Sequence, residues 1–180
     1  MLTRPGFLGN CESWRKRKSK ADSMADVFDG KVWKEFLDSD GNAFFSTAGN
    51  LGVMRNVDWF QPYTHTNHTC GVMYLVLMNL LREERFKPEN VIMVGIIPGP
   101  RAPKGDINYF LKPLVDELID VWDGVIIADT LLLGGMFKVR VALLALSCDV
   151  PAARKCGGFA GHSAAKGTYN VNIIISQYMI

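Results

Sequence analysis

Apolar runs and one amphipathic segment follow each other in an order that few folds accommodate. Three strand-like runs cover residues 51–60, 71–78 and 91–97. The polar segments that separate them, 64–69 and 82–90, are short enough for antiparallel hairpin or meander connections. The sequence therefore predicts three antiparallel strands that are consecutive along the chain.

A helix is predicted after the third run. Its apolar residues recur at intervals of three and four: Phe110, Leu111, Leu114, Val115, Leu118, Ile119 and Trp122. Asp106 suits the N-cap position, and Pro113 inside the pattern indicates either a start near residue 112 or a kink. The runs 125–128 and 137–146 then predict two strands around a turn at Gly134-Gly135.

Three strands, a helix and one long apolar strand form the opening half of a ribonuclease-H-like α/β fold. In that fold the first and fourth strands of the mixed sheet lie side by side. The N-terminal 45 residues contain only short amphipathic helical pieces, interrupted by Gly30 and ended by the turn residues 38–42. We therefore expect a small helical region ahead of the sheet.

Two carboxylates occupy unusual places in this pattern. Asp58 lies within an aromatic, strand-like segment, and Asp149 follows the apolar run 139–148 directly. Neighbouring strands lie about 4.8 Å apart, so acids at adjacent strand ends can bind common cations. Carboxylates suit Mg²⁺ or Mn²⁺, and paired ions of this kind support phosphoryl transfer. With 18 acidic residues in the chain, many other pairs are available, so the two acids alone are a weak signal.

Charge and cysteine content limit the classes of protein that fit. The net charge of +2 gives no global field for nucleic acid. A local basic cluster could still bind DNA phosphates or act as a nuclear address, with a solvated segment as the alternative; it consists of Arg15, Lys16, Arg17, Lys18 and Lys20. The widely spaced cysteines, and apolar runs too short for a membrane span, predict a soluble intracellular protein with free thiols.

Several segments, taken in order, resemble the CACTA (En/Spm-like) cut-and-paste transposases. The first is Asn56-Val57-Asp58-Trp59-Phe60-Gln61-Pro62-Tyr63, which resembles the first acidic motif of that family. The others are residues 11–15, 26–33, 79–92, 94–100, 108–118 and 148–155. The likeness extends from about residue 11 to about residue 167.

This resemblance implies a function and a division of the chain. Residues 1–45 would be an N-terminal accessory region, 46–167 the first part of a ribonuclease-H-like catalytic domain, and 168–180 a divergent tail. Asp58 and Asp149 would be the first two catalytic acids and would hold Mg²⁺ or Mn²⁺. The implied reaction is cleavage and joining of DNA at transposon ends in the nucleus.

Two departures from the family pattern bear on activity. The third acid of such a triad is expected beyond residue 180, so we expect this chain to be a fragment that is inactive alone. The family's Cys-x-x-Cys pair is missing after the segment 156–162, which leaves only Cys156 and His162 nearby as zinc ligands. Zinc binding is therefore not expected. The alternative function is a non-catalytic remnant of a transposon that binds DNA or protein.

The loop 64–69 contains two histidines, His65 and His68. We interpret it as a solvated loop, with a position near the metal edge or the DNA backbone as the alternative.

Overall fold

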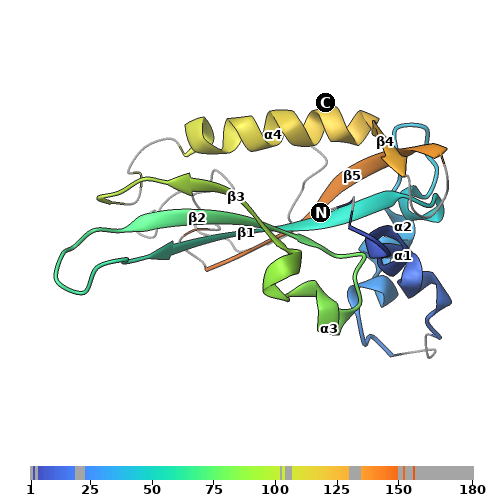
Figure 1. Ribbon diagram of the computed structural model, residues 1–180, viewed down its shortest axis with the longest axis horizontal. Helices are drawn as coiled ribbons and strands as arrows, with labels where there is room; N and C mark the ends of the chain where they lie inside the picture. Colours follow the sequence, from blue (N-terminus) through green and yellow to red (C-terminus); the bar gives the residue numbers. More distant parts are fainter. Residues whose placement is uncertain are drawn as a thin grey trace, which may run out of the picture.

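A five-stranded mixed sheet forms the centre of the computed structural model (Figure 1). The structure describes residues 2, 4–18, 23–101, 103, 107–129, 135–149, 152 and 156. The strands are β1 (Asn50–Phe60), β2 (Cys70–Leu77), β3 (Val91–Ile97), β4 (Val125–Asp129) and β5 (Gly135–Cys148). Their order across the sheet is β3-β2-β1-β5-β4.

The strand pairing follows the predicted connections. Strands β1, β2 and β3 pair antiparallel in sequence order, as the short links between them require. The β4–β5 pair is also antiparallel, whereas β5 runs parallel to β1. The mixed α/β class and the adjacency of the first strand and the long apolar strand are thus confirmed.

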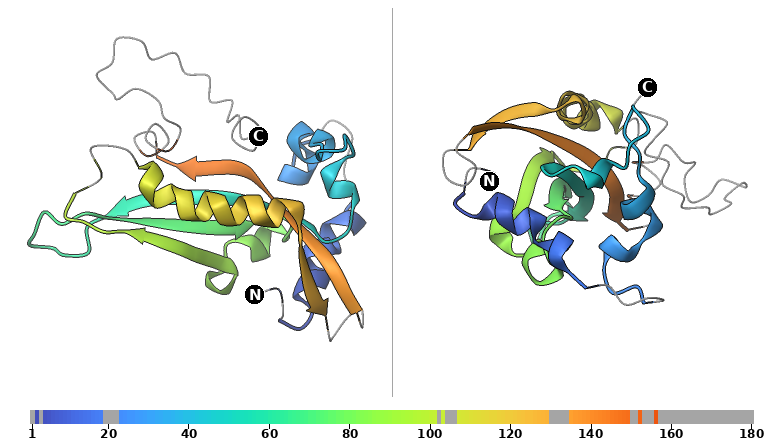
Figure 2. Two further views of the ribbon diagram at one scale, coloured as in Figure 1. Left: turned by 90° about the horizontal axis from the view of Figure 1, so that it is seen from above. Right: turned by 90° about the vertical axis from the view of Figure 1, so that its right-hand side faces the viewer.

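Eight helical elements accompany these strands among the described residues. They are α1 (Phe7–Glu12), η1 (Ser13–Lys16), η2 (Val27–Asp29), α2 (Lys31–Glu35), η3 (Phe44–Ser46), α3 (Arg82–Arg85), η4 (Pro88–Asn90) and α4 (Asn108–Asp123). Helix α4 lies along one face of the sheet, and α1 and α2 gather near the end where β1 begins (Figures 1 and 2). The loop joining β1 to β2 projects at the opposite end.

Helix α4 begins earlier than the proline suggested. It contains Pro113 as an internal residue and starts at Asn108, so the predicted start near residue 112 is wrong. Pro113 is the sixth residue, so the helix lacks the hydrogen bond that an N–H at this position would donate to the Tyr109 carbonyl. The expected N-cap, Asp106, lies outside the described residues.

Alternation along β1 divides the core between the two faces of the sheet. On the α4 face, Val57 packs with Ile107 and Leu111, while Leu51 and Val53 pack with Leu118. These odd-numbered positions of β1 point the same way because side chains in a strand alternate with a period of two.

An aromatic cluster covers part of the other face. Four of its buried members come from the N-terminal 45 residues and pack against Val76, Met78 and Ala142 of the sheet region; they are Phe28, Trp33, Phe44 and Phe45. Trp33 stacks on Phe45 with ring centroids 3.9 Å apart. A Cβ on Gly52 would lie 3.1 Å from the Trp33 ring and 2.5 Å from the Leu144 side chain, so glycine permits this close approach. The N-terminal region and the sheet therefore share a core.

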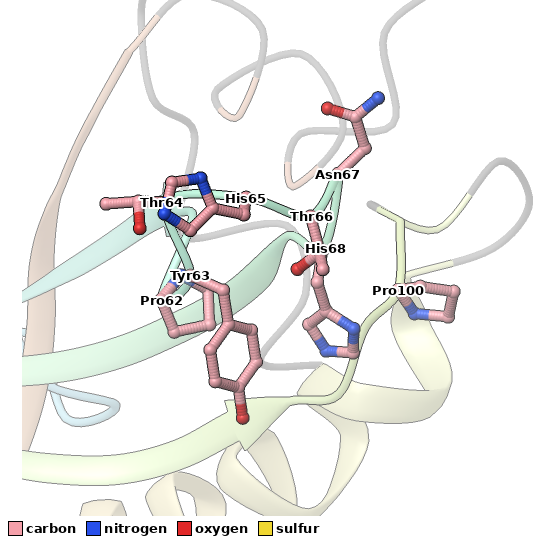
Figure 3. Close-up of a pocket in the computed structure, with 8 residues that line it drawn as sticks. All are labelled: Pro62, Tyr63, Thr64, His65, Thr66, Asn67, His68 and Pro100. Carbon is pink, nitrogen blue, oxygen red and sulfur yellow. The ribbon is translucent and has the colours of Figure 1, made fainter.

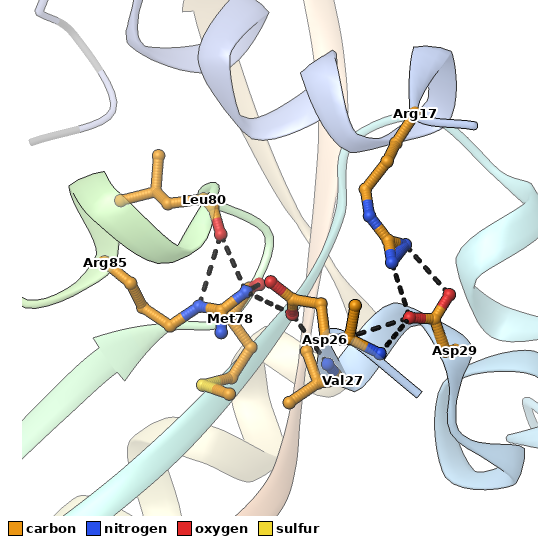
Figure 4. Close-up of polar contacts among 8 residues, drawn as sticks. Arg17, Asp26, Val27, Asp29, Met78, Leu80 and Arg85 are labelled. Atoms are coloured by element: carbon orange, nitrogen blue, oxygen red, sulfur yellow. Dashed lines mark hydrogen bonds and ion pairs between the residues drawn. The ribbon is translucent and has the colours of Figure 1, made fainter. Parts of the chain in front are cut away.

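Two buried or half-buried ion pairs fasten the N-terminal region to the sheet. Arg85 donates to the Asp26 carboxylate at 2.8 Å and to the carbonyls of Leu80 and Met78 (Figure 4). Arg140 of β5 donates to the Asp38 carboxylate at 3.1 Å. Each pair joins segments that are far apart in sequence, so each restrains the docking of residues 23–46.

Acid pH is expected to weaken this docking. The Asn42 backbone N–H, and to a lesser degree Arg140, hold the pKa of the Asp38 carboxyl below its usual 3.8, although burial opposes the shift. Because the folded-state pKa is the lower one, the stabilising contribution is present above about pH 4 and is lost as the pH falls further. We expect Asp38→Asn to reduce the acid-induced fall in the free energy of unfolding, measured by urea denaturation between about pH 7 and about pH 3.

The exposed neighbour Asp40 provides the control for that titration. Asp40→Asn should leave the pH dependence as it is in the unmodified chain. An identical acid-induced fall in the Asp38→Asn protein would contradict the assignment.

Candidate functional site

Asp58 and Asp149 occupy equivalent positions at the ends of two adjacent parallel strands. Val57 of β1 is the register partner of Cys148 of β5, and each acid is the next residue in its chain. Both carboxylate residues are exposed. With strands about 4.8 Å apart, continuing the register by one residue places the two acids side by side. Their sharing of a metal ion stays a prediction.

A β-bulge sets this register. At the start of the pairing, Val53 lies opposite Leu143, an offset of 90 residues (143 minus 53). After the bulge, Met54 lies opposite Ala145, and the offset is 91 (145 minus 54). The extra residue, Leu144, therefore brings Asp149 level with Asp58, where an unbroken ladder would have brought Cys148.

The acids lie on the face of the sheet that α4 does not cover. Val57 and Cys148 both belong to the core cluster packed with Leu111 of α4. The alternation of side chains therefore turns Asp58 to the opposite face, and the same alternation continued past β5 turns Asp149 there as well.

Backbone N–H groups orient both carboxylates. Asp58 Oδ1 accepts a 2.8 Å hydrogen bond from its neighbour Trp59, and Asp149 Oδ1 accepts one of 2.7 Å from Ala152. Two exposed carboxylates are suitable oxygen ligands for Mg²⁺ or Mn²⁺, which commonly keep several waters. Within the described part of the chain, no group of three or more His, Cys, Asp or Glu side chains has a metal-binding arrangement.

A buried arginine lies on the α4 side of the same two strands. Arg55 is only 6% exposed, and burial lowers the pKa of its guanidinium, an effect that the thiols of Cys156 and Cys148 oppose. Burial in turn raises the pKa of Cys148 to about 11, so this thiol stays protonated near neutral pH. Sequence reasoning missed Arg55, although its place among the inward-facing positions of β1 was a usable signal.

An open groove lies beyond the end of β1 and has a volume of about 750 Å³ (Figure 3). Its lining consists of Pro62, Tyr63, Thr64, His65, Thr66, Asn67, His68 and Pro100. The loop is largely exposed, as the solvated interpretation expected, and the groove begins four residues after Asp58 in the chain. His65 and His68 are thus part of a concave surface formed by the loop that follows β1, the strand that carries Asp58.

The basic cluster is partly engaged in contacts within the protein. Arg15 forms an ion pair with Glu12 and donates to the Thr47 carbonyl at 2.9 Å. Arg17 donates to both carboxylate oxygens of Asp29 (Figure 4). Lys16 and Lys18 are exposed, and Lys20 lies outside the described residues. DNA binding by the cluster stays a prediction; Arg15, Lys16 and Lys18 are its exposed members among the described residues.

Comparison with known proteins gives the family. A sequence model described as "Transposase family tnp2" matches residues 22–175. The chain belongs to this transposase family. The matched range contains both acids and the whole groove, whereas Arg15 to Lys18 precede it. None of the curated proteins compared with the chain matches it.

Membrane insertion through a helix has no support in the described part of this transposase-family chain. None of its helices is both long enough and apolar enough to cross a bilayer.

Proposed function

We propose that the chain contributes two metal-binding carboxylates to a ribonuclease-H-like catalytic centre of the CACTA type, which cleaves and joins DNA at transposon ends. The observation that carries this proposal is the register of β1 and β5. It makes Asp58 and Asp149 equivalent residues on adjacent parallel strands, in a chain that belongs to a transposase family.

The two carboxylates would hold Mg²⁺ or Mn²⁺, which would supply activation of the attacking oxygen and stabilisation of the leaving oxygen. Asp58 and Asp149 are suited to this because one oxygen of each is already fixed by a backbone N–H.

DNA would be the partner and the nucleus the place of action. Lys16 and Lys18 are exposed next to Arg15, which contacts Thr47 ahead of β1, and they would contact phosphates at that end of the sheet. These same lysines are the observation that favours the second candidate function, a remnant that binds DNA without chemistry. Metal binding separates the two, because a remnant of that kind has no use for a cation at Asp58.

A manganese titration tests the proposal. The unmodified chain should bind Mn²⁺ weakly, and Asp58→Asn or Asp149→Asn should each weaken binding on the order of tenfold or more, as loss of a metal contact does. Free Mn²⁺ can be counted by its electron paramagnetic resonance signal. Asparagine retains an oxygen that accepts the N–H of Trp59 or Ala152, so the local fold is kept.

The exposed Asp120 of α4 supplies a matched control. Asp120→Asn removes one negative charge from the far side of the sheet and should leave the manganese affinity unchanged. Equal losses in all three variants would reduce the effect to net charge, and unchanged affinity in Asp58→Asn would overturn the proposal. If both acids hold the same ion, the losses of affinity in the two single variants should not add in the double variant.

A further inference from the structure

The groove beyond β1 is a concave surface that the proposed metal site does not use. We propose that this groove binds an unpaired nucleobase of the DNA strand being processed, with the Tyr63 ring as the surface on which the base stacks. The inference rests on the proposed function, because it takes the substrate to be the DNA strand whose phosphate lies at Asp58.

The position of the groove fits a nucleotide close to the reacting phosphate. Strand β1 continues past Asp58 to Phe60, and Pro62 and Tyr63 follow directly. Five residues of extended chain span at most about 17 Å, which corresponds to a few nucleotides at about 3.4 Å each. A strand bound at the acids therefore reaches the groove within a few nucleotides. The groove volume of about 750 Å³ lies within the range of about 300–1,000 Å³ typical of ligand sites.

The side chains of the groove match the chemistry of a base. Tyr63 is 60% exposed, so its ring is accessible to a base. Its ring is nearly perpendicular to that of His68, with an interplanar angle of 78° and centroids 5.8 Å apart. Because perpendicular rings do not stack on each other, His68 leaves a stacking surface on Tyr63 available.

Polar groups around Tyr63 can read or tolerate the edges of a base. The His68 imidazole and the threonine hydroxyls of the loop provide groups that hydrogen-bond a base. None of the eight lining residues is acidic, so the surface does not repel the phosphates that accompany a base. Exposed aromatic rings combined with such groups are the usual means by which proteins bind unpaired bases.

The groove is held in shape by contacts across the loop. The Thr69 N–H donates to the Pro100 carbonyl at 2.9 Å. A Cβ on Gly99 would lie 2.4 Å from His68 Nε2, so the segment leading to Pro100 packs directly against the imidazole. Tyr63, His68 and Pro100 lie on the same side of the loop, while Asn67 points to the other (Figure 3). A surface organised before binding loses less entropy when a ligand is ordered on it.

A fluorescent base tests the inference directly. The 180-residue chain would be titrated into a duplex that has a short single-stranded overhang containing 2-aminopurine, in EDTA so that no metal takes part. We expect the emission of 2-aminopurine to be quenched by stacking on Tyr63. Tyr63→Ala should weaken binding about tenfold, within the usual range for loss of one aromatic stacking surface. Tyr63→Trp should keep both the affinity and the quenching.

Tyr109 provides a control, because it is a tyrosine on α4 that is even more exposed (82%) than Tyr63. Tyr109→Ala should bind the overhang as the unmodified chain does. The inference is overturned if Tyr63→Ala binds normally, if both alanine variants lose the same affinity, or if a blunt duplex of the same sequence binds as tightly as the overhang. A protein-binding role for the groove would give the first of these results.

Failure of this inference and failure of the proposed function are distinguishable. The base titration contains EDTA and reports only on the groove, whereas the manganese titration contains no DNA and reports only on Asp58 and Asp149. If the base titration fails and the manganese titration succeeds, only the base site is ruled out. The opposite combination leaves a DNA-binding groove without a catalytic centre and so removes the premise that the bound strand is being cleaved.

Discussion

Replacing Arg85 with alanine is expected to lower the free energy of unfolding by about 3–5 kcal/mol, the usual cost of removing one partner of a buried ion pair. The Arg85 side chain is only 5% exposed and that of Asp26 only 8%. Alanine would leave the Asp26 carboxylate buried beside the sheet without its counter-charge. It would also remove the donors to the Met78 and Leu80 carbonyls, which hold the turn after β2. The change can be measured from urea denaturation followed by circular dichroism.

Arg82 gives the matched control on the same helix. It is exposed, so Arg82→Ala should change the free energy of unfolding by no more than about 0.5 kcal/mol. The double variant Arg85→Met with Asp26→Leu removes both charges. It should be more stable than Arg85→Ala, since replacing a buried ion pair with apolar groups is often nearly neutral. Equal stability of the two single alanine variants would show that the ion pair contributes nothing.

Local pattern was enough to predict most of the sheet. The apolar runs of β1, β2 and β3 stand out because each has an inward-facing side, and short polar links allow antiparallel pairing only. The bulge at Leu144 could not be predicted in this way, because a single extra residue leaves the apolar pattern of β5 almost unchanged. Yet this residue decides which side chain of β5 lies level with Asp58.

The local pattern also predicted part of the candidate site. Asp58 and Asp149 are conspicuous because they interrupt or end apolar runs. The contacts of Arg15 with Thr47 and of Arg17 with Asp29 were not predictable, since these partners lie many residues away and are brought near only by the packing of the N-terminal region. The groove likewise depends on Pro100 meeting a loop some 30 residues earlier in the chain, a contact that no local pattern encodes.

The aromatic cluster leads to the second large effect, which bears on whether the N-terminal region is an accessory part or a piece of the catalytic fold. Trp33 is 4% exposed, stacks on Phe45 and lies over Gly52 of β1. Trp33→Ala is expected to lower the free energy of unfolding by about 3–5 kcal/mol, the usual cost of emptying a buried aromatic site.

The number of unfolding transitions should show whether the N-terminal region and the sheet unfold together. Val32, the neighbour of Trp33 on α2, is 60% exposed, and Val32→Ala should cost less than about 0.5 kcal/mol. A shared core predicts that Trp33→Ala shifts one cooperative transition to lower urea, seen alike by tryptophan fluorescence and by far-ultraviolet circular dichroism. An accessory region that folds apart from the sheet would instead give an early fluorescence change while the strand signal stayed in place. Because Phe28, Phe44 and Phe45 pack against residues of β2 and β5 as well as against each other, we expect the single transition.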